Sequence, residues 1–353
     1  MKIKTLRIEN LRNLANVSLK PHPELNYIVG DNGAGKTGIL ESLVVLSRGR
    51  SFRTSQAAEL IGPEQARFSV FAEILKDDGQ THRLGLERSG KHWKARKNTT
   101  DLAQLSLLTR SLPLVLMEPN SHLLVSGTPE YRRKFLDWGV FHVEHGFLDT
   151  WRRFSRVLKQ RNSALRQKQI DMLDSLDALI APLGTQLDSF RRVHSEHISQ
   201  ELRGLLPALS PDLEGITLDY QNGWGAELYE RALYDCRERD LERGTTGLGP
   251  HRAELIMMKG RMLARAMLSR GEQKLLAAAL LLSQAELLSS LGERPVILLD
   301  DLASEFDQAH FCSVLSKSME RGGQVWVTGI QTPDLPEKHS VFHVKHGVTQ
   351  KML

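Results

Sequence analysis

The N-terminal part of the chain alternates apolar and polar positions in a way that predicts β-strands. Residues 3–8 and 17–19 alternate, and the polar stretch between them predicts a hairpin-like connection. Residues 25–29 form a short apolar run that ends at a glycine, which predicts a buried strand. From 39 to 46, apolar residues recur at helical spacing. The pattern from 25 to 46 therefore predicts a strand, a glycine-rich loop and a helix in succession.

A second pattern begins near Pro129 and continues to about Arg243, where the chain is predicted to be almost wholly helical. Pro182 lies inside this stretch and is predicted to kink or break its helix. Two apolar stripes predict paired helices that form a short antiparallel arm. The first stripe holds Leu148, Trp151, Leu158 and Leu165, and the second holds Leu173, Leu176, Ile180, Leu183, Leu187 and Phe190.

Strand and helix patterns return towards the C-terminus. Residues 271–288 predict a helix rich in alanine and leucine, and 296–299 and 324–328 predict buried strands. Residues 342–345 predict an edge strand. The whole pattern predicts an α/β fold with a helical segment inserted in it.

Composition narrows the class of protein. The hydrophobic fraction is 41% and the charged fraction 25%, which is normal for a globular protein with a core. No apolar run reaches the length of about 18 residues that a membrane helix needs, and the N-terminus lacks a secretory pattern. The two cysteines, Cys236 and Cys312, are expected to be buried reduced thiols, as in a cytoplasmic protein. We therefore expect no membrane association.

Positive charge is concentrated in one segment. The chain carries a formal net charge of +5, and residues 129–168 alone contain ten Lys or Arg against four Asp or Glu. Such a segment attracts an anionic partner, and DNA is the partner we expect. Any one of these side chains could instead belong to a solvated helix face or to a structural ion pair. The candidate DNA contacts are Arg132, Arg133, Arg152, Arg153, Arg156 and Lys159.

The first motif with clear chemistry fits the pattern G-x-x-x-x-G-K-[ST] between the predicted strand and helix. Glycines let backbone N–H groups surround phosphate oxygens, and the helix N-terminus favours the anion. Lys36 is expected to contact the β- and γ-phosphates of ATP, and Thr37 to ligate Mg²⁺. The cofactor-binding residues of this P-loop are Gly30, Asp31, Asn32, Gly33, Ala34, Gly35, Lys36 and Thr37.

A carboxylate pair follows the predicted strand 296–299. Asp300 is expected to hold Mg²⁺ and Asp301 to polarise the attacking water, although both could be solvated turn residues. Lys36 and Asp300 are 264 residues apart, more than a compact P-loop domain needs. We therefore expect residues 1–120 and 244–353 to form one ATPase head, with 121–243 inserted as a helical arm.

Ser269, Arg270 and Gly271 open the predicted helix at 271–288. Alone they would fit an ordinary N-capped helix equally well. In a chain with a P-loop, and 31 residues before Asp300, they resemble the signature of ABC ATPases, in which serine and glycine contact the γ-phosphate held by a second subunit. Residues 304–307 resemble the D-loop of the same ATPases, where Asp307 would be structural or interfacial.

Further motifs extend this resemblance over nearly the whole chain. The sequence is similar to the RecF family of bacterial recombination mediators, relatives of the SMC-type ABC ATPases. The motifs that carry the likeness, besides the P-loop, are residues 10–13, 49–54, 132–137, 160–162, 249–252 and 298–307.

This resemblance implies an ABC-type ATPase head and a role in DNA repair, replication, recombination and the SOS response. It implies an ATP-dependent homodimer that binds duplex DNA near single-strand gaps, hydrolyses ATP slowly and helps to load RecA, with RecR and RecO as partners. It further implies that Arg12, just after the first strand, reaches the γ-phosphate, unless Arg12 is a surface residue. Glu272 stands where glutamine is frequent, and no histidine follows residues 327–329 to sense the γ-phosphate.

Three other classes of protein fit the sequence less well. An ATPase subunit of a transporter would have far fewer residues between Lys36 and the signature. A chromosome-structural SMC protein needs hundreds of heptad residues, which this chain lacks. A DNA-binding protein with an inactive P-loop is disfavoured by the intact Lys36, Thr37 and Asp300.

Overall fold

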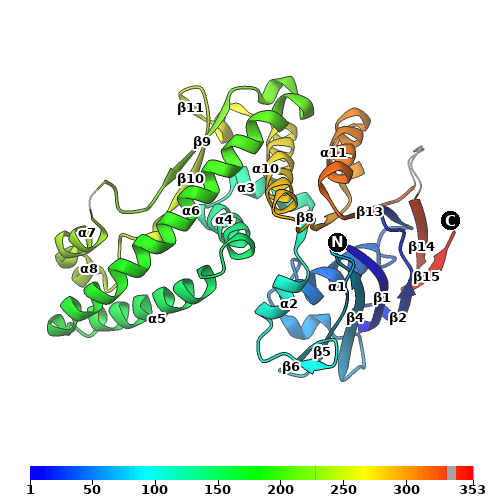
Figure 1. Ribbon diagram of the computed structural model, residues 1–353, viewed down its shortest axis with the longest axis horizontal. Coiled ribbons are helices and arrows are strands. Elements are labelled where there is room, and N and C mark those ends of the chain that lie inside the picture. Colours follow the sequence, from blue (N-terminus) through cyan, green and yellow to red (C-terminus); the bar gives the residue numbers. More distant parts are fainter. Residues whose placement is uncertain (227, 332–338, 353) are drawn as a thin grey trace. The chain divides into compact units, whose positions relative to one another are not determined.

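The computed structural model describes residues 1–226, 228–331 and 339–352 (Figure 1). The chain forms two compact units. Unit 1 comprises residues 1–121 and 278–353, and unit 2 comprises residues 122–277. Unit 2 includes residues 244–277, which were expected to belong to the ATPase head. The predicted signature at 269–271 is therefore part of unit 2.

One sheet of unit 1 is antiparallel, with strand order β2-β1-β4-β5-β6-β7. The predicted N-terminal hairpin is confirmed, because β1 pairs with β2 across a two-residue connection. The strands are β1 (Lys2–Leu11), β2 (Leu14–Leu19), β4 (Arg67–Leu75), β5 (Thr81–Ser89), β6 (His92–Lys97) and β7 (Thr100–Asp101).

The other sheet of unit 1 is mostly parallel, with order β15-β14-β3-β13-β12-β8. Its strands are β3 (Leu25–Val29), β8 (Leu114–Met117), β12 (Val296–Leu299), β13 (Gln324–Gly329), β14 (His339–Lys345) and β15 (Val348–Lys351). The prediction of an edge strand at 342–345 was wrong. A tight turn at Gly347 (φ 76°) folds β15 back onto β14, so β14 lies inside the sheet.

Helix α1 (Lys36–Arg48) connects the two sheets of unit 1. It contacts β1, β4 and β5 of the antiparallel sheet and β13 of the parallel sheet. Burial on both sides explains why 11 of its 13 residues are buried. The other helical segments of unit 1 are η1 (Ala57–Leu60), α2 (Ser106–Ser111), η6 (Leu302–Ser304) and α11 (Gln308–Arg321). Asp307 has the structural role expected of it, because its side chain caps α11 by accepting from the backbone N–H of His310 at 2.9 Å.

Unit 2 is built around two helices that lie alongside each other, α5 and α6 (Figure 1). The helical segments up to the first strand of the unit are η2 (Pro119–His122), which crosses the unit boundary, then α3 (Leu123–Ser126), α4 (Pro129–Val143), α5 (Phe147–Arg166), η3 (Ile170–Met172), α6 (Leu173–Leu209) and η4 (Pro211–Leu213). Those that follow are α7 (Tyr229–Asp235), α8 (Arg237–Arg243), η5 (Pro250–Arg252), α9 (Ala264–Met267) and α10 (Arg270–Ser290), which continues into unit 1.

Two details of the predicted arm differ from the structure. Helix α6 runs through Pro182 without a break. A proline removes one N–H donor, and the contacts of α6 with α4, α5 and α7 outweigh that loss. Trp151, placed on the buried stripe, is 41% exposed, while Phe154 and Arg161 are buried. The other three residues of the predicted stripe do lie inward: Leu165 is buried, and Leu148 and Leu158 are half-buried and pack against a core cluster.

Unit 2 also holds a small antiparallel sheet that the sequence analysis did not predict. Its order is β11-β10-β9, formed by β11 (Met262–Leu263), β10 (Glu254–Lys259) and β9 (Ile216–Gln221). Strand β9 lies within the stretch that was expected to be almost wholly helical. Its residues alternate apolar and polar positions, ITLDYQ, with the polar ones exposed, so the sequence did carry a strand pattern within the stretch expected to be helical.

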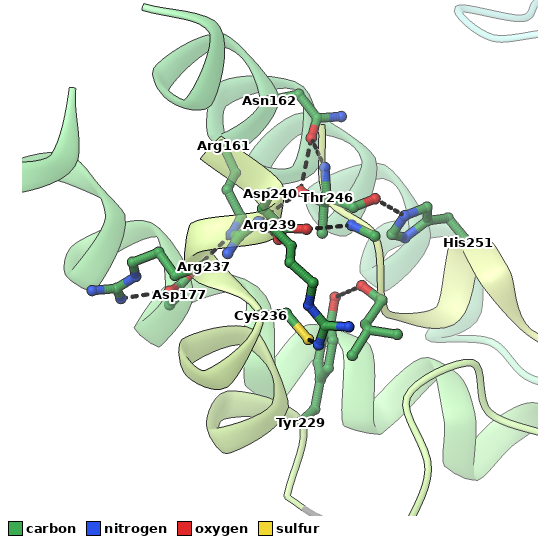
Figure 2. Close-up of polar contacts among 12 residues, drawn as sticks. Arg161, Asn162, Asp177, Tyr229, Cys236, Arg237, Arg239, Asp240, Thr246 and His251 are labelled. Carbon is green, nitrogen blue, oxygen red and sulfur yellow. Dashed lines mark hydrogen bonds and ion pairs between the residues drawn. The ribbon is translucent and has the colours of Figure 1, made fainter. Parts of the chain in front are cut away.

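A buried ionic network joins α5, α6 and α8 (Figure 2). The Arg161 guanidinium donates to Asp177 at 2.6 Å and to Asp240 at 2.7 Å. It also donates to the Thr246 hydroxyl at 2.9 Å, and the Asn162 side chain accepts from the Thr246 backbone N–H at 2.8 Å. The family motif at 160–162 therefore has a structural role, because it fastens the 244–252 loop to the helices.

Two expectations from composition can be compared with the structure. Cys236 is buried as expected, but Cys312 is exposed, because it lies on the outer side of the amphipathic helix α11. Within the described residues, no helix is long and apolar enough to cross a membrane, and no group of three or more His, Cys, Asp or Glu could hold a metal ion.

Candidate nucleotide-binding site

The P-loop connects the end of β3 to the start of α1. Gly30, Gly33 and Gly35 have positive φ angles of 150°, 79° and 117°, which side chains rarely allow. A Cβ on Gly30 would lie 2.3 Å from the backbone oxygen of Val344, so only glycine fits there. At Gly33 no atom lies within 4 Å of such a Cβ, which leaves room beside the loop backbone. The loop can therefore approach a phosphate closely.

Lys36 and the N-terminus of α1 supply positive charge to this loop. The Lys36 ammonium donates to the backbone oxygens of Gly30 at 2.7 Å and Asp31 at 3.0 Å, which holds it over the loop. Gly35 precedes the helix and offers no side chain to cap it. The first N–H groups of a helix without such a cap are suited to a phosphate, so these residues fit a nucleoside triphosphate.

Asp300 lies at the end of β12, between the ends of β8 and β13. One of its oxygens, Oδ1, accepts from the Thr37 hydroxyl at 3.0 Å and from the Thr328 hydroxyl at 2.8 Å. Burial raises the pKa of Asp300 above its usual range, although these two hydrogen bonds oppose the shift. A hydroxyl and a carboxylate side by side are the oxygen ligands that Mg²⁺ prefers, so the pair fits this ion.

Asp301 has a left-handed backbone (φ 53°), a conformation that aspartate tolerates better than most residues. Its backbone N–H donates to the Thr328 hydroxyl at 2.8 Å. The Thr328 hydroxyl thus accepts from the Asp301 backbone and donates to the Asp300 carboxylate. This bridge holds the Asp300 carboxylate against the backbone of Asp301.

Glu118 is a residue of this site that the sequence analysis missed. It follows β8 directly, and β8 pairs with β12, so Glu118 lies beside Asp300. Burial, and then the charge of Asp300, raise the pKa of Glu118 to about 7, although the charge of Arg48 opposes the shift. Glu118 could have been found from the sequence, because it is an acidic residue directly after the apolar run 114–117. Asp300 was chosen as a candidate by the same pattern after 296–299.

Arg12 lies in the turn between β1 and β2, beside the P-loop. The Asn13 side chain of the same turn donates to the backbone oxygens of Gly33 and Ala34, both at 3.4 Å. Arg12 itself forms a bidentate ion pair with Glu41 of α1, with Nη2 and Oε1 2.8 Å apart. The structure therefore brings Arg12 close to the predicted phosphate site and also gives it a protein partner.

The predicted signature is exposed at the N-terminus of α10, in unit 2. Ser269 and Glu272 form a capping box. The Ser269 hydroxyl accepts from the Glu272 backbone N–H at 3.3 Å, and the Glu272 carboxylate accepts from the Ser269 N–H at 2.7 Å. Glu272 thus has a local structural role, while Arg270 and Gly271 are exposed to solvent.

The six candidate DNA contacts fall into two groups. Arg132 is only 5% exposed, and it pairs bidentately with Glu254 and donates to three backbone oxygens. Arg133 is half-buried and donates to the Ala253 oxygen at 2.9 Å. Both hold α4 against the segment around β10. The exposed group, all on α5, comprises Arg152, Arg153, Arg156 and Lys159.

Sequence comparisons identify a protein family and several related proteins. A family model described as the RecF/RecN/SMC N terminal domain matches residues 2–352. The chain is 43% identical over 360 residues to the DNA replication and repair protein RecF of Stenotrophomonas maltophilia (strain R551-3), covering 98% of each chain. It is 38% identical over 356 residues to the protein of that name from Thioalkalivibrio sulfidiphilus (strain HL-EbGR7), again covering 98% of each.

Solved structures show the same fold. A structure described as the recombination mediator protein RecF–ATP in the RecFOR pathway superimposes with a TM-score of 0.90 at 25% identity, covering 100% of this chain and 98% of that one. An Smc head bound to the C-winged helix domain of ScpA gives 0.61 at 15% identity, covering 100% and 97%. The predicted ABC-type α/β head and the resemblance stated above are confirmed.

Proposed function

The chain belongs to the RecF family of DNA replication and repair proteins, within the RecF/RecN/SMC N terminal domain family, and from this premise we propose that it is an ATP-switched clamp on DNA. In this proposal ATP and Mg²⁺ join two copies of the chain into a dimer that binds duplex DNA near single-strand gaps. Slow hydrolysis then releases the dimer.

The observation that carries the proposal is the pairing of the P-loop with Asp300. Thr37 and Asp300 are hydrogen-bonded at 3.0 Å although they are 263 residues apart in the chain. The fold thus assembles a hydroxyl and a carboxylate for Mg²⁺ next to the uncapped N-terminus of α1. Thr37 and Asp300 would hold Mg²⁺, which would neutralise charge on the phosphates of the nucleotide.

The dimer is proposed from the signature at the start of α10. Ser269, Arg270 and Gly271 are exposed, so a second copy could reach them. In the proposed dimer they contact the γ-phosphate of the ATP held by the other copy, and each P-loop is completed by its partner. Since these contacts exist only in the dimer, ATP binds the dimer more tightly than the monomer and shifts the equilibrium towards it.

DNA binding is proposed through α5. Arg152, Arg156 and Lys159 recur at helical spacing on one face, and Arg153 adjoins them. Exposed cations in such a row suit the phosphate backbone and carry no base information, so sequence preference should be weak. By family membership we further propose RecR and RecO as partners, loading of RecA as the outcome, and a cytoplasmic location.

The proposal is tested by sedimentation velocity of the wild-type chain and Ser269→Arg, with and without ATP and Mg²⁺. The wild type is expected to shift from monomer to dimer with ATP. Ser269→Arg puts bulk and charge at the interface, so it should bind ATP as a monomer and fail to dimerise. Arg231→Ala, a surface change in unit 2, is the control that should dimerise normally. A dimer of Ser269→Arg would contradict the composite site.

A further inference from the structure

Two separate segments of unit 1 converge on one carboxylate, that of Glu41 in α1. Glu41 has no exposed surface. The β1–β2 turn contributes Arg12, whose Nε and Nη2 both donate to Glu41. The segment after α1 contributes Ser51, whose hydroxyl donates to Glu41 Oε1, and Arg53, whose Nη1 lies 3.6 Å from Oε2. Two guanidinium groups thus share one buried negative charge.

The geometry of the Arg12 pair leaves one side of its guanidinium open. A guanidinium has five N–H donors in a planar fork, and Glu41 occupies the side formed by Nε and Nη2. Nη1 makes no hydrogen bond or ion pair with any residue in the described part of the chain. Arg12 keeps 22% of its side chain exposed. It is therefore held from one side and can donate from the other.

The turn that carries Arg12 is held in place from two directions. The Arg12 backbone N–H donates to the Leu60 oxygen at 2.9 Å, and the Gly62 N–H donates to the Asn10 oxygen at 2.7 Å. On the other side, the Asn13 side chain contacts the P-loop oxygens of Gly33 and Ala34. The turn therefore lies between the P-loop and the segment that follows α1.

Glu41 also sits on the helix that begins with Lys36 and Thr37. It is five residues after Lys36, so its carboxylate moves with the helix that presents the phosphate-binding groups. The Ser51 hydroxyl accepts from the backbone N–H groups of Arg53 and Thr54, which ties the 51–54 turn to the same carboxylate. Burial raises the pKa of Asp300, and the positive charge of Arg53 partly opposes that shift, so Arg53 lies close enough to interact with Asp300.

From this arrangement we infer that Glu41 is a positioning residue of the nucleotide site. It does not touch the nucleotide. It fixes the Arg12 guanidinium side-on, so that Nη1 can donate to the terminal phosphate of ATP, and it ties the 51–54 turn to the same helix. ADP lacks that phosphate, so Glu41 favours ATP over ADP through Arg12. The inference rests on the proposed function, because it requires ATP to bind at the P-loop.

The test is an equilibrium titration with fluorescent analogues of ATP and ADP, in the presence of Mg²⁺. Glu41→Gln keeps the size of the side chain and removes its charge. We expect ATP affinity to fall by about 10-fold, the value of one charge-assisted hydrogen bond, and ADP affinity to change by less than about 2-fold. Glu73→Gln, on the outer face of the antiparallel sheet and paired with Arg83, is the matched control and should leave both affinities unchanged.

A double-mutant cycle separates positioning from mere stabilisation. If Glu41 acts through Arg12, then Arg12→Ala and Arg12→Ala/Glu41→Gln should lose the same amount of ATP affinity. The inference would be overturned if the losses of ATP affinity from the two single changes multiplied in the double variant. It would also be overturned if Glu41→Gln lost ATP and ADP affinity equally, or kept the wild-type affinity for ATP.

A milder variant covers the case in which Glu41→Gln does not fold. Ser51→Ala removes one donor to Glu41 Oε1 and keeps the carboxylate. It should weaken ATP binding by about 2- to 3-fold with ADP binding preserved, and unchanged ATP binding in this variant would count against the inference. If the wild type bound neither nucleotide, the proposed function would fail instead, so the two failures are distinguishable.

Discussion

The two units of this protein bury charged side chains for different ends. In unit 2, buried arginines meet carboxylates of the same unit: Arg161 meets Asp177 and Asp240, and Arg191 meets Asp137. Each positive charge has a matching negative charge within hydrogen-bond distance. The network in Figure 2 joins segments that are far apart in the sequence and has no need of a ligand.

In unit 1, by contrast, two buried charged side chains at the P-loop, Lys36 and Asp300, are held by neutral groups. Lys36 is held only by backbone oxygens, which carry no net charge. Asp300 is held by two hydroxyl groups on one of its oxygens. Among the residues that the structure describes, neither makes an ion pair, and Asp300 is bonded to Thr37 at the end of the P-loop. Buried charges held only by neutral groups, as at Lys36 and Asp300, indicate a ligand. A buried charge matched by opposite charges is structural at Arg161, whereas at Glu41 the match leaves a donor of its partner Arg12 open.

The largest expected effect is on the stability of unit 2. Arg161→Ala removes the arginine that Asp177 and Asp240 share, although Asp177 keeps its pair with Arg237, and breaking a buried pair costs about 3–5 kcal/mol. Chemical denaturation should show this loss in the free energy of unfolding. Arg231→Ala removes an exposed i,i+4 pair with Asp235 and should change that free energy by less than about 1 kcal/mol. If the two variants lowered the free energy of unfolding equally, the buried arginines of unit 2 would not have the structural role described above.

The next effect is on ligand binding rather than stability. Lys36→Ala removes the only side-chain cation held over the P-loop by loop oxygens in the described residues. ATP affinity should fall by about 100-fold or more, since the ammonium makes charge-assisted contacts with two phosphates. The free energy of unfolding without nucleotide should change little. Isothermal titration with ATP measures the first quantity, and wild-type affinity in the variant would show that the site is misassigned.

The sequence predicted the parts of this site that depend on order along the chain. A strand, a glycine-rich loop and a helix follow one another from 25 to 48, so the P-loop could be found by pattern. Asp300 was found because it ends an apolar run. The insertion between Lys36 and Asp300 followed from their spacing.

Properties that depend on partners far away in the chain could not be predicted. Arg132 was a candidate DNA contact because it lies in a basic segment. Its partner Glu254 is 122 residues away in the chain, so nothing in the sequence indicated the ion pair. Glu118 gained its raised pKa only when β8 paired with β12, which brought Asp300 beside it. Trp151 is 41% exposed although it has the helical spacing of its buried neighbours, because its exposure depends on what the rest of the chain packs against that turn of α5. Charge and burial at such positions are set by tertiary contacts.

A smaller effect separates the two adjacent carboxylates of unit 1. Asp301 is one methylene shorter than the glutamate that many ABC ATPases place after the metal-binding aspartate, and a misplaced base costs about 100-fold in rate. We therefore expect turnover well below about 10 per second. Asp301→Asn should lower it by about a further 100-fold and preserve ATP-dependent dimers. Asp300→Asn should weaken Mg²⁺-dependent ATP binding as well.

Steady-state ATPase rates and nucleotide affinities of the two variants, measured side by side, decide this assignment. The Thr328 hydroxyl holds both residues, so a general disturbance of the loop would affect both variants alike. Wild-type turnover in Asp301→Asn would remove Asp301 from the mechanism and make Glu305 the next candidate. Equal loss of Mg²⁺-dependent binding in both variants would mean that the two carboxylates share the metal.

The smallest effects are expected on α5, where Arg152, Arg153 and Arg156 are exposed to solvent. Each phosphate that Arg152, Arg153 or Arg156 neutralises releases counterions and adds about 0.9 to the slope of log affinity against log salt. The triple alanine variant should therefore bind duplex DNA with a slope shallower by about 2.7, and each single change should weaken binding only slightly. Arg132→Lys is the contrasting variant. Because Arg132 is bound to Glu254, this change should lower the stability of the protein without changing the salt slope of DNA binding. Fluorescence anisotropy with labelled duplex DNA at several salt concentrations measures all of these. If the triple variant keeps the wild-type slope, α5 is an ordinary solvated face and does not bind DNA.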